Sequence, residues 1–130
     1  MTARISWQGV FPAVTTQFRE DLSLDIDATA RVIAALVDDG VSGLVICGTV
    51  GENTALTLHE KVQVMEAARS VAAGRVPVIC GVAEFTTPFA IETAKQAALQ
   101  KVERLIGAPH LVAELGRQGG ARARELYNTQ

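Results

Sequence analysis

Apolar and polar residues alternate in blocks along the first three quarters of the chain. Short runs rich in β-branched residues occupy positions 10–14, 43–47 and 76–82. Continuous apolar runs of this length are typical of strands that are covered on both faces, as in parallel sheets. The pattern therefore predicts three buried strands.

A longer segment with the spacing of an amphipathic helix follows each of these runs. The first predicted helix begins at Asp25, whose side chain is suited to an N-cap, and it ends at Gly40. Its apolar positions recur at helical spacing. The residues expected on its buried stripe are Ile26, Ala30, Ile33, Leu36 and Val37.

Two further helices have clear starting signals. Thr57 and Glu60 have the spacing of a capping box, and Gly74 is expected to end that helix. Its predicted apolar face carries Val62, Met65, Ala68, and Val71 or Ala72.

Thr87 followed by proline predicts a third start, because proline is tolerated at the first helical position. That helix is expected to pass through Ile91 and Ala94 and to end near Ala98.

The order strand, helix, strand, helix, strand, helix predicts right-handed βαβ units on a parallel sheet. Units of this length match the repeat of a (β/α)8 TIM barrel, which needs about 250 residues for eight units. The fold class expected is α/β, with residues 1–98 forming the N-terminal three βα units of a barrel. Residues 99–130 contain no β-branched run, and they predict a helical tail broken at 107–109 and at 119–120. An appendage without a specific function is an equally open interpretation of that tail.

Charge and composition exclude several classes of function. The chain has 130 residues and a net charge of −2, which gives no electrostatic footprint for nucleic acid or an anionic membrane surface. No apolar run approaches the length of about 18 residues that suggests a membrane span, and the start does not resemble a signal peptide. Cys47 and Cys80 lack metal-binding spacing and are expected to be reduced, buried thiols. These features predict a cytoplasmic protein.

Candidate chemistry lies in the turn GTVGEN at residues 48–53, directly after the second predicted strand. Ligands of parallel α/β folds bind beyond the carboxyl ends of the strands. Gly48 and Gly51 would allow a tight turn and an approach of backbone N–H groups to a small anion. Glu52 and Asn53 are expected to orient the loop through backbone hydrogen bonds. A glycine-rich turn without a ligand remains an open alternative, and neither a phosphate loop nor a dinucleotide fingerprint is present.

Three segments together resemble a known family. GVFPAVTTQF, GTVGENTALTLHEK and RVPVICGVAEFTTPFAIETAK, in this order and spacing, are similar to the dihydrodipicolinate synthase/N-acetylneuraminate lyase family over about residues 8–98. The TTQF and GTVGENTAL forms look most like the subgroup of pyrroline-4-hydroxy-2-carboxylate deaminases. The resemblance implies a class I aldolase on a TIM barrel, without a cofactor. A sixth-strand lysine would form a Schiff base with a 2-oxo acid or related substrate, and a fourth-strand tyrosine would move protons.

The same resemblance implies roles for the turn. Thr49 matches the first hydroxyl of the family's Gly-Thr-Thr-Gly-Glu turn and would be the catalytic proton-relay group. Val50 replaces the second hydroxyl, so that only its backbone N–H could contact the substrate carboxylate. Losing a hydrogen bond to a charged group typically costs about 1.5–3 kcal/mol, which suggests a substrate other than the synthase's pyruvate. The residues expected to bind substrate are Ala13, Thr15, Thr16, Gly48, Val50 and Gly51.

The chain contains no match to the family's strand-four tyrosine or strand-six lysine. Lys61 and Lys95 fall on predicted helices and are expected to be solvated charges, and Lys101 lies in the tail with Tyr127. Glu84, after the third predicted strand, is a weaker candidate expected to face the ligand side. Two aromatic residues, Trp7 and Phe11, are expected to serve in packing. Two histidines, His59 and His110, lack partner ligands, so no metal site is expected.

Three hypotheses remain open from the sequence. The first is a truncated member of the lyase family, with aldol or deamination chemistry on a 2-oxo acid or a pyrroline carboxylate. The second is a non-catalytic partial barrel whose unpaired sheet edges bind another copy or a complementing fragment, as a homo-oligomer or split enzyme. The third is that residues after Ala98 arise from an altered reading frame, which sequencing of the coding DNA would test.

Overall fold

The structure is a computed structural model that describes residues 8–105 and the side chains of residues 8–100. The chain divides into two compact units, Met1–Ala97 and Ala98–Gln130. The elements are α1 (Ile26–Asp38), β1 (Leu44–Ile46), the short 3-10 helix η1 (Asn53–Ala55), α2 (Leu58–Ala72), β2 (Val78–Cys80) and α3 (Thr87–Leu105). The predicted tail breaks at 107–109 and 119–120, and Trp7, His110 and Tyr127, lie outside the described residues.

The two strands are parallel, with Leu44 opposite Val78 and Ile46 opposite Cys80. Parallel pairing with an intervening helix confirms the predicted α/β pattern for this part of the chain. Both strands are shorter than the apolar runs that predicted them, and each lies within its run.

The predicted first strand, residues 10–14, is reduced to a single parallel bridge between Ala13 and Val45. Val14 N donates to Val45 O at 2.8 Å, and Val45 N donates to Pro12 O at 3.0 Å. The ladder stops there because Pro12 has no N–H group to donate to the next carbonyl. Three complete βα units therefore remain a prediction, since the first unit has a bridge in place of its strand.

Helix α1 begins as the sequence predicts, because the Asp25 side chain accepts a hydrogen bond from Ala28 N at 2.9 Å. Its fully buried residues are Thr29, Ile33 and Val37. The burial of Thr29 was not expected from an apolar stripe. Its hydroxyl donates to Asp25 O and accepts from Gln17 N, so the polar group is satisfied inside the core.

Helix α2 has the predicted capping box, with reciprocal hydrogen bonds between Thr57 and Glu60. The helix ends at Ala72, followed by Ala73 and Gly74, which both have positive φ. Its buried residues are Lys61, Val64, Met65, Ala68 and Ala72. The stripe therefore includes a lysine where the sequence predicted a solvated charge.

Helix α3 begins at Thr87 as predicted but continues to Leu105, beyond the expected end near Ala98. Its apolar residue Ile91 is largely exposed, whereas Thr93 is buried. The buried side of this helix is therefore marked by a threonine hydroxyl, which cannot be identified from hydrophobic spacing alone.

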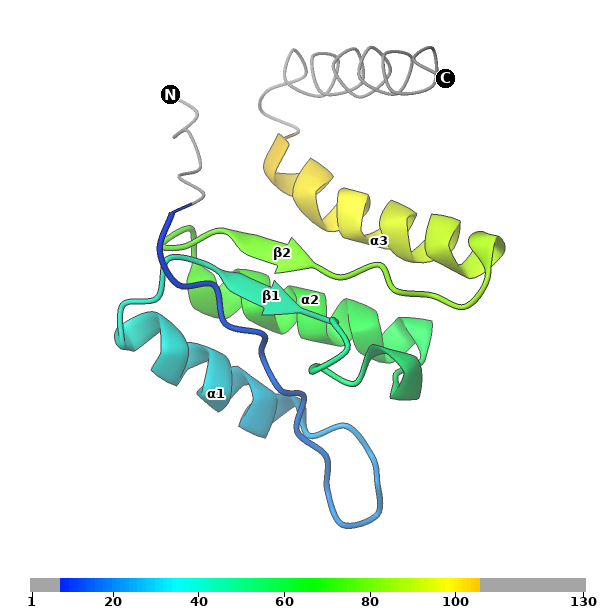
Figure 1. Ribbon diagram of the computed structural model, residues 1–130, viewed down its shortest axis with the longest axis horizontal. Helices are drawn as coiled ribbons and strands as arrows, with labels where there is room; N and C mark the ends of the chain where they lie inside the picture. Colours follow the sequence, from blue (N-terminus) through cyan, green and yellow to red (C-terminus); the bar gives the residue numbers. More distant parts are fainter. Residues whose placement is uncertain (1–7, 106–130) are drawn as a thin grey trace. The chain divides into compact units, whose positions relative to one another are not determined.

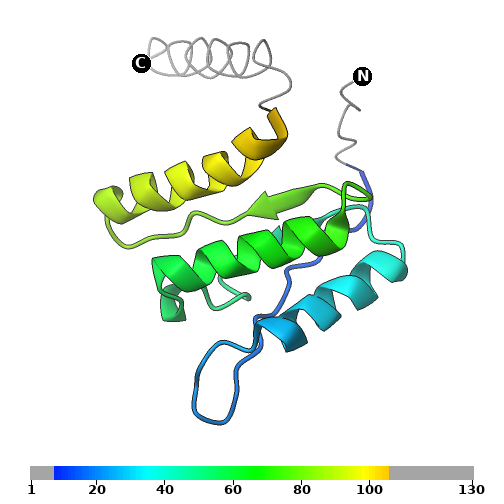
Figure 2. The ribbon, with the colours of Figure 1, turned by 180° about the vertical axis from the view of Figure 1, so that it is seen from behind.

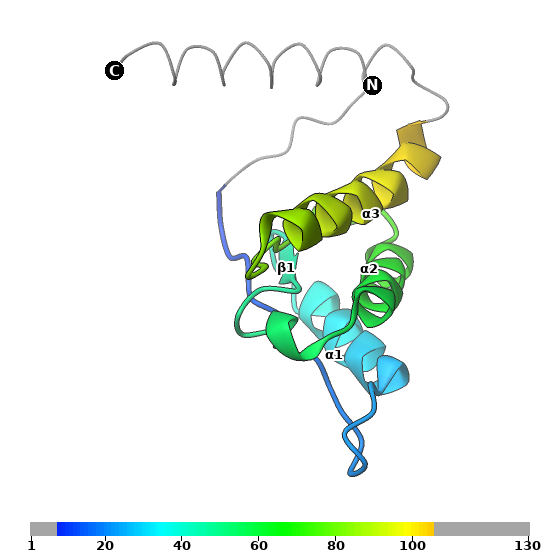
Figure 3. The same ribbon diagram turned by 90° about the vertical axis from the view of Figure 1, so that its right-hand side faces the viewer.

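The core lies on one side of the sheet. Helix α2 contacts α1 and both strands, and Figures 1 and 2 show it behind the strands from one side and in front of them from the other. Figure 3 shows α1 and α2 packed side by side, seen close to end on. Leu44 and Ile46 point into this core, whereas Val45 and Ile79 are only half-buried and Ala13 is exposed. The face that a complete barrel would turn inward is thus open in this unit.

Candidate functional site

The turn after β1 and the segment before α1 come together at the carboxyl ends of the strands. The buried Thr16 hydroxyl donates to Gly51 O at 2.8 Å. A Cβ atom at Gly51 would lie 3.0 Å from Val14 O and 3.3 Å from Cys47 N, so the close contact between the two segments requires glycine. Residues predicted to form one site, around Thr16 and Gly51, are therefore neighbours in the structure.

The tip of the turn is open to solvent. Thr49 is exposed, Val50 is 56% exposed, and Gly48 is half-buried. Ala13 and Thr15 are also exposed, and the Thr15 hydroxyl accepts a hydrogen bond from Gln17 Nε2 at 3.1 Å.

Thr16 differs from these exposed residues, because its hydroxyl is bound to the backbone of the turn. It was predicted to line the substrate cavity with Thr15. Its buried hydroxyl holds the turn through Gly51 O, and its predicted contact with substrate stays a prediction.

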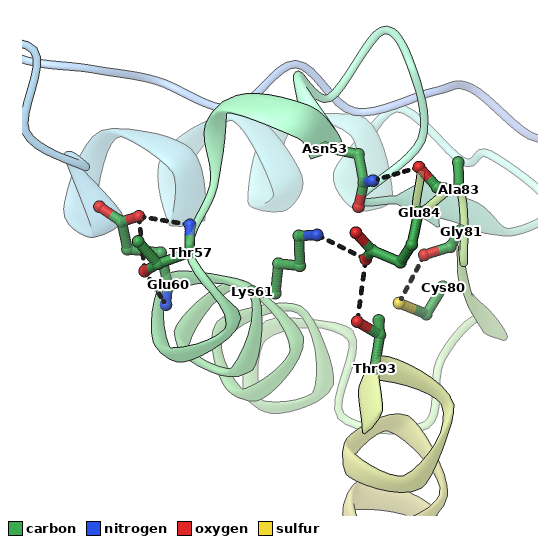
Figure 4. Close-up of polar contacts among 9 residues, drawn as sticks. All are labelled: Asn53, Thr57, Glu60, Lys61, Cys80, Gly81, Ala83, Glu84 and Thr93. Carbon is green, nitrogen blue, oxygen red and sulfur yellow. Dashed lines mark hydrogen bonds and ion pairs between the residues drawn. The ribbon is translucent and has the colours of Figure 1, made fainter. Parts of the chain in front are cut away.

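Backbone hydrogen bonds close the turn. Glu52 N donates to Thr49 O at 3.1 Å, and Asn53 N donates to Gly48 O at 3.2 Å. Glu52 has a left-handed backbone conformation, with φ of 55°, and its side chain is exposed. The Asn53 side chain is buried and its Nδ2 donates to Ala83 O at 2.9 Å, which ties the turn to the segment after β2 (Figure 4). The predicted orienting role of Asn53 is confirmed.

A buried polar cluster beside this turn was not expected from the sequence. Lys61 Nζ lies 2.5 Å from Glu84 Oε1, and the Thr93 hydroxyl donates to the same oxygen at 2.8 Å (Figure 4). The side chains of Lys61 and Glu84 are only 5% and 10% exposed. The hydrogen bond from Lys61 is the main cause that lowers the pKa of Glu84 below its ordinary value, against an opposing effect of burial.

One prediction about this cluster was wrong, because Lys61 is buried and paired, not solvated. Glu84 follows β2, bonds to Lys61 of α2 and Thr93 of α3, and lines a cavity, so its place on the ligand side stays a prediction. One signal in the sequence could have identified Lys61. It lies four residues before Met65 and seven before Ala68, so it continues the apolar stripe of α2.

A cavity of about 300 Å³ lies next to this cluster, between the start of α2 and the start of α3. Leu58, Lys61, Phe85 and Phe89 are among the residues that line it. The exposed turn residues Thr49 and Val50 do not line this cavity, so the turn and the cavity are separate features.

The remaining candidate groups are placed as follows. Lys95 is exposed on α3, 3.8 Å from Glu92. Phe11 packs against Gly43, where an added Cβ atom would lie 2.2 Å from the ring, in agreement with its predicted packing role. Within residues 8–105, no group of three or more histidine, cysteine or acidic side chains is arranged to hold a metal ion.

None of the described helices is both long enough and apolar enough to cross a lipid bilayer.

Comparison with known proteins agrees with this geometry. The model of the dihydrodipicolinate synthetase family matches residues 6–104. A 4-hydroxy-tetrahydrodipicolinate synthase of Salinibacter ruber is 41% identical over 91 residues, which cover 70% of this chain and 30% of the relative. A DapA-like lyase of Rhizobium meliloti is 34% identical over 107 residues, covering 82% of this chain and 34% of the relative.

Solved structures of lyases and synthases of this family superpose on the chain. N-acetylneuraminate lyase from Mycoplasma synoviae superposes with a TM-score of 0.69 and 32% identity, covering 73% of this chain and 33% of that structure. Dihydrodipicolinate synthase from Acinetobacter baumannii, solved in complex with pyruvate, has a TM-score of 0.69 and 29% identity over 73% of this chain and 33% of its own. The chain thus spans about a third of the length of these relatives. It belongs to the dihydrodipicolinate synthetase family, whose members are lyases of the class I aldolase type.

Proposed function

We propose that the turn at residues 48–51 is the carboxylate-binding and proton-relay element of a Schiff-base lyase that acts on a small 2-oxo acid. The observation that carries this proposal is the position of Thr49. Its side chain is exposed at the carboxyl end of β1, on a turn held by Thr16 and Asn53. A rigid support of this kind suits a group that must meet a substrate in one orientation.

The chemistry of the turn follows from its side chains. The Thr49 hydroxyl both donates and accepts hydrogen bonds, so it can pass a proton between a substrate and a second hydroxyl. At Val50 only the backbone N–H is available to a carboxylate, and an apolar side chain stands beside it. This combination favours a substrate with an apolar or ring portion near its carboxylate. A pyrroline carboxylate, as expected from the deaminase-like forms of the sequence, is such a substrate, whereas the relatives named above are synthases and lyases.

Among the side chains of residues 8–100, which the structure describes, no free amine faces this turn. The Lys61 side chain is buried and its Nζ bonds to the Glu84 carboxylate between α2 and α3, so it does not reach the turn as a nucleophile. Lys95 lies on the surface of α3. We expect the Schiff-base lysine and the relay tyrosine to come from segments outside this sequence.

Borohydride trapping tests this expectation. The chain is incubated with pyruvate and sodium borohydride, and its intact mass is measured. We expect no adduct on this chain and a reduced adduct on the complete synthase from Salinibacter ruber as the positive control. A covalent adduct on any lysine of this chain would contradict the proposal.

A chimera tests the role of Thr49 itself. Residues 8–98 replace the corresponding third of the Salinibacter ruber synthase, which supplies the remaining catalytic groups. Thr49→Val should lower kcat by a factor of about 100 or more, typical of a lost proton-transfer group, while borohydride trapping stays possible. The chimera is assayed with pyruvate and with pyrroline-4-hydroxy-2-carboxylate. An unchanged kcat in the Thr49→Val chimera would refute the relay role.

Val50→Thr in the same chimera tests the carboxylate contact. Restoring a hydroxyl should lower KM for pyruvate by about tenfold or more, because a hydrogen bond to a charged group contributes about 1.5–3 kcal/mol. A rise in KM for pyruvate would show that Val50 does not stand at the carboxylate position.

A non-catalytic assembly role is the second candidate. The half-buried side chains of Val45 and Ile79, on the open face of the sheet, favour it because such a surface can bind another copy or a complementing fragment. Sedimentation over a range of concentrations distinguishes the two candidates. Reversible self-association would support assembly, whereas a monomer at high concentration would count against it.

A further inference from the structure

The sequence contains two cysteines, and the fold places them at the same end of neighbouring strands. Cys80 is the last residue of β2 and pairs with Ile46, so Cys47 is the residue directly after its partner. Paired residues of parallel strands lie about 4.8 Å apart, so Cys80 lies beside Ile46 and one residue from the level of Cys47.

The backbone segments at the ends of β1 and β2 lie close to each other. Gly81 N donates to Ile46 O at 2.8 Å, and a Cβ atom at Gly81 would lie 2.6 Å from Cys47 O. Cys47 has a left-handed conformation, with φ of 52°, which ends the alternation of side chains along β1. The residue is 1% exposed, and the neighbouring Cys80 is the main cause that raises the pKa of its thiol.

We propose that Cys47 and Cys80 are a redox modification site that forms a reversible disulfide within one chain. The oxidant is a peroxide. One thiolate attacks a peroxide oxygen, the O–O bond breaks, and a sulfenic acid and hydroxide form; the second sulfur then attacks the sulfenic sulfur and displaces its oxygen as water. Two thiols and one hydrogen peroxide give one disulfide and two water molecules, so the thiols lose two electrons to the peroxide.

The surroundings of the two thiols indicate their order of reaction. Cys80 is half-buried and donates weakly to Gly81 O at 3.4 Å, so its sulfur is the more accessible to peroxide (Figure 4). The neighbouring Cys80, together with burial, raises the pKa of the Cys47 thiol, so Cys47 has less thiolate character as the first nucleophile. Cys80 is therefore the initial site of oxidation and Cys47 the resolving thiol.

The disulfide would act on the turn described above. Gly48 follows Cys47 directly, and the same strand ends are bridged by the bond from Asn53 to Ala83 O. A covalent bond between Cys47 and Cys80 would fix the distance between β1 and β2 immediately before the turn that carries Thr49.

Mass spectrometry of the full chain tests the proposal. The folded protein is treated with hydrogen peroxide, quenched, denatured and alkylated without reductant. We expect a mass decrease of about 2 Da, the loss of both alkylation adducts and a linked pair of tryptic peptides, residues 32–61 and 76–95. Thioredoxin or dithiothreitol should restore both adducts.

Cys80→Ser and Cys47→Ser are the matched controls, and neither can lose 2 Da within a single chain. Cys47→Ser should still gain a sulfenic acid at Cys80, detected with dimedone, whereas Cys80→Ser should react more slowly with peroxide. The proposal is overturned if the wild-type chain keeps both alkylatable thiols, gains only oxygen atoms, or forms disulfides only between chains on a non-reducing gel.

Discussion

At the scale of single residues, the buried pair of Lys61 and Glu84 stands out because two opposite charges lie in the interior. A buried ion pair gains little overall, since the cost of removing both charges from water offsets their attraction. Removing one partner is different, because the other charge is then left uncompensated. Removing either Lys61 or Glu84 alone should therefore lower the free energy of unfolding strongly.

Glu84→Gln leaves the Lys61 ammonium buried without an opposite charge. We expect a loss of about 3 kcal/mol in the free energy of unfolding, measured by urea denaturation. Adding Lys61→Met to this variant should recover most of the loss, since the uncompensated charge is removed. Glu92→Gln is the matched control, because the Glu92 and Lys95 pair is exposed and should contribute less than about 1 kcal/mol. Equal losses in the two Gln variants would show that Glu84 is not buried.

The same pair predicts a dependence of stability on pH. The pKa of Glu84 is lowered in the folded chain, mainly by the hydrogen bond from Lys61. The ionised Glu84 carboxylate therefore stabilises the folded chain. This contribution is complete above the ordinary glutamate pKa of about 4.3, and it is lost as the pH falls through the lowered pKa of Glu84 in the folded chain. Urea denaturation at several pH values below about 5 should show a smaller fall in stability for Glu84→Gln than for the wild type. Parallel curves would contradict the assignment.

At the scale of elements, the start of each helix is determined locally. The capping box of α2 joins Thr57 N to Glu60 Oε2 at 2.8 Å and Glu60 N to Thr57 Oγ1 at 3.3 Å. Thr57→Ala should reduce the free energy of unfolding by about 1 kcal/mol, because an N-terminal N–H group loses its acceptor. Thr57→Ser keeps the hydroxyl and should be close to wild type in the same urea titration. A loss in the Ser variant as large as in the Ala variant would attribute the effect to the methyl group.

The sequence was informative where structure depends on near neighbours. Asp25 and Thr57 mark helix starts because capping involves residues within one helical turn, and the Thr87–Pro88 pair marks the start of α3. The strand predicted at 10–14 is longer than the bridge observed. Pro12 has no N–H group, and whether a ladder needs that group depends on the position of the partner strand, which the local sequence does not give. Lys61 was misassigned for a similar reason, since its partner Glu84 lies 23 residues away.

In the candidate site too, features that depend on near neighbours were predicted and those that depend on distant residues were not. The position of the turn after β1 could be predicted from the apolar run that precedes it, and the structure brings Thr16 and Gly51 together there. The burial of the Thr16 hydroxyl could not be predicted, because it depends on a carbonyl 35 residues away.

At the scale of the whole described unit, the core on the helix side of the sheet should carry most of the stability. Ile46 is fully buried on that side, and Val45, its neighbour, is half-buried on the open face. Ile46→Ala should cost about 2–5 kcal/mol, whereas Val45→Thr should cost less than about 1 kcal/mol. Thermal and urea unfolding measure both changes. A Val45→Thr loss as large as that of Ile46→Ala would show that the open face is covered in solution.

The distribution of this core along the chain has a consequence for folding during synthesis. Among the described residues, every fully buried apolar side chain, from Val14 to Ala72, precedes Ala73. A chain that emerges from the ribosome N-terminus first therefore holds all of these buried apolar residues before β2 has been made. Strand β2 and helix α3 then add partly buried apolar residues such as Val78, Cys80 and Ala97, together with the polar cluster around Glu84.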